Sequence, residues 1–293
     1  MGEPPAGGPV SEPAPAKVNP FLRVLGRRDD GYHDVETLIQ PVTLADGVQA
    51  APAADGFTLT VAGERTEGVP AGEENLVVRA ARALSETFSV DRGARVLLAK
   101  RIFVAAGLGG GSADAAATLR ALDRLWALGL GVEGLAAVAA RIGSDVPALL
   151  PGGPVVVRGR GELVEPAEVS ATWWVLVPFA FGLSSADAYG WWDQDGVGPG
   201  PDPSPLLEAL RVGDLPEAGR RLANDLGAGV VRRYPIVGEA IEGVLEAGAL
   251  GALVCGSGPT VAGLVRDGFH AEEVAGMVGG HAVGSMGRQR SAG

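Results

Sequence analysis

Four glycines lie within five consecutive residues near the middle of the chain, in the run Gly107-Leu108-Gly109-Gly110-Gly111-Ser112. Glycine has no Cβ atom, so such a run can adopt positive φ and direct several backbone N–H groups at one anion. The alanine-rich residues that follow, about 113–128, predict a helix, whose unpaired amides and dipole add to this attraction. The run therefore predicts a phosphate-binding loop at the start of a helix, with a flexible glycine turn as the alternative.

Two common phosphate-binding motifs do not fit this run. A P-loop ends in Gly-Lys followed by Ser or Thr, which is absent here. The dinucleotide fingerprint needs a third glycine where Ser112 stands, and it usually lies in the first βα unit of a chain, whereas this run begins only at residue 107. The loop thus indicates a nucleotide site of another kind.

Composition narrows the class of protein. A length of 293 residues allows about two domains. No stretch approaches the roughly 20 apolar residues of a membrane span, and residues 1–15 lack the features of a signal peptide and predict a disordered tail. The net charge of −11 argues against nucleic acid or an anionic membrane as partner, and one cysteine, Cys255, fits a reducing cytoplasm.

Lysine is rare in this chain. Of the 24 basic residues only Lys17 and Lys100 are lysine, and the others are arginine. A retained lysine is a weak pointer to a site that needs a compact ammonium rather than a planar guanidinium, and chance is the alternative.

The order of the expected elements indicates an α+β fold. Strands come early and mix with helices without a regular βαβ period. The expected early strands are 17–25, 34–44, 57–61 and 96–104, and the expected early helices are 75–88, 113–128 and 132–142. The second half predicts strands at 155–157, 173–177, 250–255 and 260–265, with helices between them and one more at the end. Residues 195–205, rich in Gly, Pro and Asp, predict a surface loop.

Three motifs, in the right order, resemble those of the GHMP kinases, the family of galactose, homoserine, mevalonate and phosphomevalonate kinases. Pro15 to Asn19 is similar to the first motif, Val104 to Ala116 to the second, and Gly256 to Val261 to the third. The resemblance covers roughly residues 13–280. It implies a two-lobed α+β fold, with an N-terminal lobe like ribosomal protein S5 domain 2 and a ferredoxin-like C-terminal lobe. The corresponding boundaries are a tail at 1–12, an ATP-binding lobe at 13–165 and a second lobe at 166–285.

Further segments are similar to the branch of the family that phosphorylates 4-diphosphocytidyl-2-C-methyl-D-erythritol in the non-mevalonate isoprenoid pathway. The discriminating element is Gly31-Tyr32-His33, because other members of the family do not read a cytidine ring in this way. The remaining carriers are Arg27 to Asp34, Gly143 to Pro147, Gly159 to Glu162 and Asn224 to Leu226. The resemblance implies transfer of phosphate from ATP to the 2-hydroxyl of that substrate, giving the 2-phosphate and ADP.

The resemblance also implies roles for individual residues. Asp145 would be the base and Lys17 the cation beside it, whereas without the resemblance Asp145 is expected to cap a helix ahead of Pro147. The nucleotide-binding residues would be Phe103, Val104, Ala105, Ala106, Gly107, Leu108, Gly109, Gly110, Gly111, Ser112 and Ala113, with Asn75 in the adenine pocket or serving only as a helix cap. The substrate-binding residues would be Asn19, Tyr32, His33 and Tyr189.

The expected ligands are ATP, Mg²⁺ and a cytidine diphosphate-linked polyol, bound by a monomer or homodimer. No protein cage for Mg²⁺ is evident in the sequence, so the ion is expected on the ATP phosphates, with Ser112 as a candidate ligand. Phe103 departs from the family pattern, since proline usually stands there. Two alternatives remain open: a GHMP kinase of the homoserine or mevalonate type, and a non-catalytic binding protein of the same fold.

Overall fold

The computed structural model describes residues 8–287, and it divides into two compact units that are each assembled from separate stretches of the chain. Unit 1 contains the described residues up to 16, then 44–104 and 109–151. Unit 2 contains 17–43, 105–108 and the described residues from 152 onward. The chain therefore passes from one unit to the other inside the glycine run, after Leu108. The expected lobe boundary at 165/166 stays a prediction.

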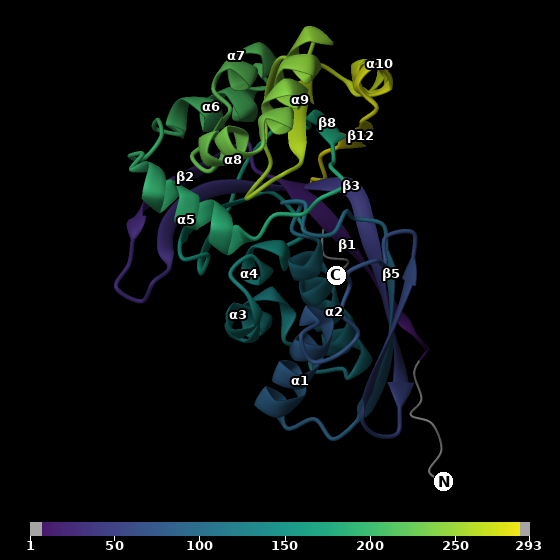
Figure 1. Ribbon diagram of the computed structural model, residues 1–293. Helices are drawn as coiled ribbons and strands as arrows, with labels where there is room; N and C mark the ends of the chain where they lie inside the picture. Colours follow the sequence, from purple (N-terminus) through teal and green to yellow (C-terminus); the bar gives the residue numbers. More distant parts are fainter. Residues whose placement is uncertain (1–7, 288–293) are drawn as a thin grey trace. The chain divides into compact units, whose positions relative to one another are not determined.

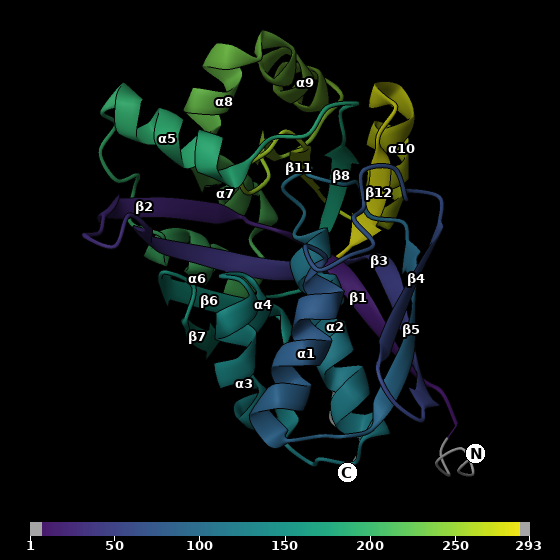
Figure 2. The ribbon, with the colours of Figure 1, turned by 60° about the horizontal axis from the view of Figure 1, so that its bottom comes forward.

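Unit 1 packs a layer of helices against a sheet (Figure 2). Its strands are β1 (Val10–Val18), the second half of β3 (His33–Ala53), β4 (Phe57–Gly63) and β5 (Gly93–Lys100). Its helices are α1 (Leu76–Phe88), α2 (Gly110–Leu125), α3 (Gly131–Ile142) and α4 (Val146–Leu149). Strand β5 pairs antiparallel with β3 and parallel with β4, while α1 contacts both α2 and α3.

Strand β1 corrects the expectation of a disordered tail over residues 1–15, and with it the tail boundary at residue 12. The strand begins at Val10 and pairs with β3, and the side chains of Ala14 and Ala16 are fully buried. Propensity misses this strand because it is rich in Pro and Ala, which are uncommon in strands, whereas burial of the alternating alanines stabilises it. Residues 1–7 lie outside the described part of the chain.

The segment that carries the glycine run also differs from its expected boundaries. Strand β5 ends at Lys100 rather than continuing to Val104, because the backbone N–H groups of Arg101 and Ile102 donate to Oδ1 of Asp46 rather than to a neighbouring strand. Helix α2 begins at Gly110 rather than at Ala113, so the last glycines of the run form its first turn.

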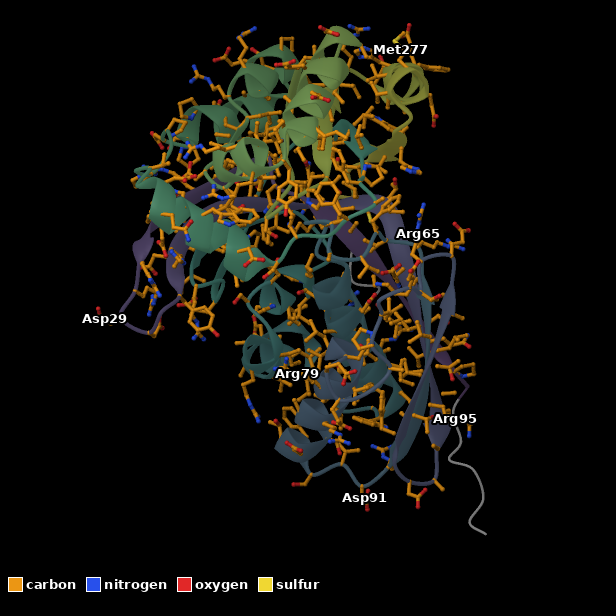
Figure 3. All side chains as sticks on the ribbon, viewed as in Figure 1. Asp29, Arg65, Arg79, Asp91, Arg95 and Met277 are labelled. Atoms are coloured by element: carbon orange, nitrogen blue, oxygen red, sulfur yellow. The ribbon has the colours of Figure 1, made fainter. Side chains whose placement is uncertain are left out.

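Unit 2 contains two sheets (Figure 1). The first sheet combines β2 (Phe21–Arg27), the first half of β3, β6 (Val155–Gly159), β7 (Leu163–Pro166) and β9 (Ala223–Asn224). Strands β2 and β3 form a hairpin that closes at the Arg27–His33 pair, and Asp29 lies at its tip with its side chain directed away from the fold (Figure 3).

The second sheet of unit 2 is antiparallel and has the strand order β10-β11-β8-β12. Its strands are β8 (Trp173–Val177), β10 (Gly251–Val254), β11 (Val261–Val265) and β12 (His281–Gly284). The helices of unit 2 are α5 (Ser185–Asp195), α6 (Ser204–Val212), α7 (Leu215–Arg220), α8 (Gly227–Arg233), α9 (Pro235–Glu246) and α10 (Gly268–Val278). Helices α5 to α9 connect β8 to β10, and α10 connects β11 to β12, which confirms the ferredoxin-like arrangement.

The fold of the described residues is α+β, as the order of elements predicts. Most strand pairs among these residues are antiparallel, whereas β2–β9 and β4–β5 are parallel. No helix within residues 8–287 has both the length and the apolar content that a membrane crossing requires.

Candidate functional site

The ammonium group of Lys17 lies against the glycine run within unit 2. Its Nζ donates to the carbonyl oxygen of Gly107 at 2.5 Å and to Oδ1 of Asn19 at 2.6 Å. The backbone N–H of Lys17 also donates to the carbonyl of Leu108 at 3.0 Å. An ammonium has three protons, so these two side-chain bonds leave one donor for a further acceptor.

Asn19 orients this lysine. Its side-chain Nδ2 donates to Oγ1 of Thr37 at 2.9 Å, and Thr37 in turn donates to the carbonyl of Phe21. With its amide nitrogen bound to Thr37, the oxygen of Asn19 is directed at Lys17. Asn19 and Lys17 are 2% and 4% exposed, so the pair is held in a fixed geometry beneath the surface.

The third glycine motif closes around the same ammonium. Gly256 has a φ of +55°, and a Cβ atom built there would lie 2.5 Å from Nζ of Lys17 and 2.7 Å from the carbonyl oxygen of Gly107. A Cβ at Gly107 would overlap the carbonyl oxygen of Cys255. Both positions require glycine because two backbone turns and one lysine side chain are in close contact there. Residues of the first, second and third motifs therefore meet inside unit 2.

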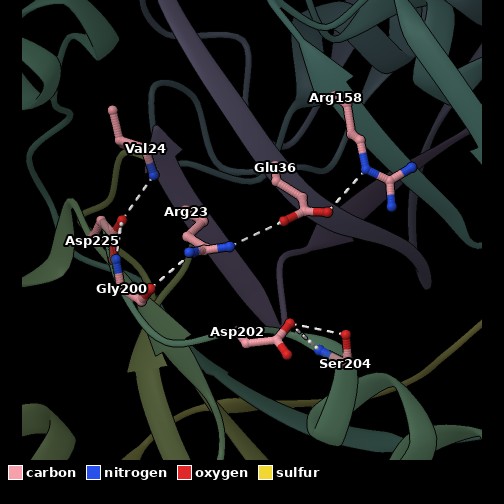
Figure 4. A network of polar contacts seen from close by, with 8 residues as sticks. All are labelled: Arg23, Val24, Glu36, Arg158, Gly200, Asp202, Ser204 and Asp225. Atoms are coloured by element: carbon pink, nitrogen blue, oxygen red, sulfur yellow. Dashed lines mark hydrogen bonds and ion pairs between the residues drawn. The ribbon is translucent and has the colours of Figure 1, made fainter. Parts of the chain in front are cut away.

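Asn224 supports the third motif, a role that sequence reasoning did not assign. Its Nδ2 donates to the carbonyl oxygens of Val254 and Gly256, both at 2.7 Å, while its Oδ1 accepts from the N–H of Leu226. The neighbouring Asp225 accepts from the backbone N–H groups of Val24 and Gly200, at 2.8 and 3.0 Å (Figure 4). Through these hydrogen bonds, Asn224 and Asp225 connect the glycine turn to β2 and to the 195–205 loop.

A second lysine cluster is buried in unit 1. Nζ of Lys100 pairs with Oδ2 of Asp46 and with Oδ2 of Asp114, the latter at 2.7 Å. All three side chains are at most 4% exposed. A Cβ at Gly110 would lie 3.5 Å from this Nζ, so the cluster sits directly under the first turn of α2. The rarity of lysine was the only sequence signal for this cluster.

Burial and the neighbouring charges shift the pKa values of Lys100 and Asp114. Burial disfavours the charge of Lys100, but Asp114 and Asp46 outweigh it and leave the pKa of Lys100 above its ordinary value. Burial raises the pKa of Asp114 to about 7, although Lys100 opposes the shift, and its Oδ1 has no hydrogen-bond partner in the described structure.

The Asp114 carboxyl predicts a pH dependence of stability. Since its pKa of about 7 exceeds the unfolded value near 4, its contribution is fully present below pH about 4 and is lost as the pH rises through about 7. Asp114→Asn should therefore flatten the decline of Tm between pH about 4 and 7, the interval between the two pKa values, measured by thermal unfolding. Asp55→Asn, at an exposed position, is the control and should retain the wild-type slope. Equal slopes for wild type and Asp114→Asn would contradict the assignment.

The N-terminus of α2 is open to an anion. Gly109 occupies the N-cap with a φ of +70°, and no side chain caps the helix. The first backbone N–H groups of the helix are therefore available to an acceptor from outside. The side-chain hydroxyl of Ser112, a half-buried residue of the first turn, has no hydrogen-bond partner within residues 8–287.

Two residues expected near the nucleotide have structural partners. Asn75 caps α1 by accepting from the N–H of Val77 at 2.9 Å and donates to the carbonyl of Pro70 at 2.6 Å, so the capping role is confirmed. Phe103 lies under the guanidinium of Arg65, whose carbon is 4.0 Å from the ring centroid. Val104, the next residue, is 40% exposed.

Asp145 stands at the N-terminus of the four-residue helix α4, but its side chain makes no capping hydrogen bond. The carboxylate is half-buried and has no hydrogen bond or ion pair within the described residues. Asp145 therefore occupies the expected N-cap position but does not cap the helix through its side chain, and its carboxylate has no structural partner among the described residues.

The residues expected to bind a base lie in unit 2. The imidazole of His33, at the start of β3, stacks on the ring of Tyr189 from α5, with centroids 4.9 Å apart and planes at 24°. Tyr32 lies in the hairpin turn, is 52% exposed, and carries the guanidinium of Arg160 above its ring at 4.8 Å. The structure thus joins His33 to Tyr189 and places Tyr32 separately beside Arg160.

Comparisons with known proteins agree with the three-motif pattern. Residues 75–153 match the family model described as the GHMP kinases N terminal domain, and residues 206–282 match the GHMP kinases C terminal model. A 4-diphosphocytidyl-2-C-methyl-D-erythritol kinase from Pelotomaculum thermopropionicum is 45% identical over 267 residues, which cover 89% of this chain and 91% of that protein.

Solved structures show the same fold. A crystal structure of 4-(cytidine 5′-diphospho)-2C-methyl-D-erythritol kinase superposes with a TM-score of 0.81 at 34% identity, covering 95% of this chain and all of that one. A homoserine kinase from Cytophaga hutchinsonii has a TM-score of 0.76 at 20% identity, with 99% and 98% covered, which is evidence for the fold alone.

Proposed function

The chain belongs to the GHMP kinase family, and we propose that it transfers the γ-phosphoryl group of ATP to the 2-hydroxyl of 4-diphosphocytidyl-2-C-methyl-D-erythritol in the non-mevalonate isoprenoid pathway. The observation that carries this proposal is the ammonium of Lys17, held against the Gly107 carbonyl and the Gly256 turn with one donor unused. Such a group suits a reaction in which negative charge builds on phosphoryl oxygens.

Lys17 supplies the positive charge in this proposal. Its remaining N–H is the donor for a phosphoryl oxygen, and the buried position strengthens the interaction because water does not screen it. Asn19 and the Gly107 carbonyl hold the ammonium in place before substrate binds, so little reorganisation is needed when charge develops.

Asp145 is the base of the proposed reaction. It accepts the proton of the 2-hydroxyl as that oxygen attacks phosphorus, and a carboxylate without a structural partner is available for this task. Its identification rests on the Gly143 to Pro147 motif, on the chemistry that the reaction needs and on its unpaired state.

The nucleotide phosphates are assigned to the N-terminus of α2, whose first amides no side chain caps. Residues 103–113 form the proposed nucleotide-binding segment, with Asn75 lining the adenine pocket. Since both polar groups of Asn75 already have partners, its contribution to that pocket is one of shape rather than of hydrogen bonding.

Mg²⁺ is assigned to the ATP phosphates. Within residues 8–287 no group of three or more His, Cys, Asp or Glu side chains is arranged to hold a metal ion by itself. The unpaired hydroxyl of Ser112 is the oxygen that the proposed nucleotide-binding segment can offer to the ion. When bound, the ion would neutralise phosphate charge.

The cytidine end of the substrate is assigned to Tyr32, His33 and Tyr189. Asn19 is assigned to the methylerythritol hydroxyls through the second lone pair of its Oδ1, beside Lys17. The stacked pair of His33 and Tyr189 offers a flat surface for a base, and Tyr32 offers a second, exposed aromatic ring. These aromatic rings, with the imidazole nitrogens of His33, suit an acceptor that carries a cytosine base. Homoserine and mevalonate carry no base.

The proposal is tested by assaying the purified protein with ATP, Mg²⁺ and 4-diphosphocytidyl-2-C-methyl-D-erythritol, and in parallel with homoserine and with mevalonate. Of the three acceptors, we expect only the cytidine substrate to be phosphorylated, giving ADP and the 2-phosphate. Phosphorus NMR of the product identifies the position of the new phosphate. Turnover of homoserine or mevalonate, without turnover of the cytidine substrate, would overturn the assigned acceptor. Absence of ATP-dependent turnover with all three would favour a binding protein.

A further inference from the structure

His33 is held by three residues of one helix. Its Nε2 lies 2.8 Å from Oδ1 of Asp193, its ring stacks on Tyr189, and its ring meets Trp192 edge-on with centroids 5.8 Å apart and planes at 89°. Tyr189 and Asp193 are four residues apart on α5, so they lie on the same side of that helix. The imidazole is 8% exposed, and its surroundings therefore determine its orientation.

Asp193 also determines which nitrogen of His33 carries a proton. An ionised carboxylate can only accept a hydrogen bond, so the contact requires a proton on Nε2. In the neutral ring Nδ1 is then left without a proton. Oδ2 of Asp193 lies 3.6 Å from the guanidinium of Arg27, on the strand that pairs with β3 at His33, so the second carboxylate oxygen also has a partner.

We propose that Asp193 is a positioning residue for the cytidine end of the substrate: its hydrogen bond holds the His33 ring parallel to Tyr189 and keeps the proton on Nε2. This inference rests on the proposed function. Without that bond the imidazole can turn about its side-chain torsions or change tautomer, and the stacked surface that receives the base loses its fixed orientation.

The placement of α5 does not depend on Asp193. Ala188 of this helix packs in an apolar cluster with Leu22, Val24 and Leu226, and Tyr189, Trp191 and Trp192 pack against that cluster. These contacts anchor the helix to β2 without a charged group. Removing the carboxylate should therefore change the state of His33 while leaving the fold of unit 2 intact.

The test compares wild type with Asp193→Asn, which preserves the shape of the side chain but can also donate to Nε2. Replacing the charge-assisted hydrogen bond with a neutral one whose direction is no longer fixed should raise KM for the cytidine substrate about tenfold, which corresponds to about 1.4 kcal/mol, with KM for ATP and kcat within twofold of wild type. The dissociation constant of cytidine 5′-diphosphate, measured by calorimetry, should rise by a similar factor. Asp187→Asn, an exposed carboxylate on the same helix, is the matched control and should leave all of these constants unchanged.

A spectroscopic readout separates positioning from a general structural effect. The chain has only three histidines, so ¹⁵N-histidine spectra can be assigned with His33→Gln. We expect the protonated-Nε2, bare-Nδ1 pattern for His33 in wild type and in Asp187→Asn, and a mixture of tautomers in Asp193→Asn.

The outcomes distinguish this inference from the proposed function. Equal cytidine 5′-diphosphate affinity in wild type and Asp193→Asn, or an unchanged His33 spectrum, would overturn the role of Asp193 alone. Wild type that binds cytidine 5′-diphosphate but does not turn over the substrate would overturn the acceptor assignment alone. Wild type that binds no cytidine 5′-diphosphate would overturn both.

Discussion

Replacing Asp145 with asparagine should lower kcat for the cytidine substrate by about 10²–10⁴-fold, the range expected when a general base is removed. Asparagine preserves the volume of the side chain and can still hydrogen-bond a hydroxyl, so KM for both substrates should change little. Because Asp145 has no hydrogen bond or ion pair in the described structure and does not cap α4, Tm should stay within about 1 °C of wild type. The measurements are steady-state kinetics and thermal unfolding.

The matched control for this change is Asp187→Asn, which removes an exposed carboxylate elsewhere and should retain wild-type kcat. Wild-type activity in Asp145→Asn would remove the base role and leave the family assignment unaffected. A large fall in Tm would instead indicate that Asp145 has a structural function.

Replacing Lys17 with methionine should lower kcat by about 10²–10³-fold, comparable to the loss of one preorganised donor to a developing negative charge. Methionine approximates the length of the lysine stem but removes the donors to Gly107 and Asn19 and the one left for a phosphoryl oxygen. Lys17→Arg should not restore activity, because a planar guanidinium is larger than the ammonium and Gly256 lies directly beside Nζ. Single-turnover kinetics separate this effect on the chemical step from effects on binding.

Arg79→Met is a suitable control for the lost charge. Arg79 is an exposed cation on α1, and its replacement should leave kcat within twofold of wild type. If Lys17→Met and Arg79→Met reduced activity equally, the effect would be one of net charge rather than of a group in the site.

Several features of the site could be predicted from residues alone. The glycine run predicted an anion site at a helix start, and α2 indeed begins within the run without a side-chain cap. The rarity of lysine singled out Lys17 and Lys100, and both proved to be buried in polar clusters. These positions could be singled out because glycine and lysine have properties that no common substitute supplies.

Other features depended on partners far away in the chain. The strand over Val10–Val18 has a composition that propensity assigns to a tail, and pairing with β3 together with burial of its alanines overrides that preference. Asp145 looked like a helix cap ahead of Pro147, yet its side chain makes no capping bond. The role of Asp193 could not be predicted from the sequence. Nothing in the pattern of its helix indicates that its carboxylate contacts a histidine 160 positions earlier in the chain.

The glycine run shows where the two kinds of information divide. The sequence by itself determined that a glycine run would lie at a helix start and leave backbone amides free for an anion, because these are local properties. Only the tertiary structure decided that Lys17 would lie against Gly107 with Gly256 closing over it. Those contacts join positions up to 239 residues apart, and which of them form depends on the packing of whole strands and turns rather than on any local preference.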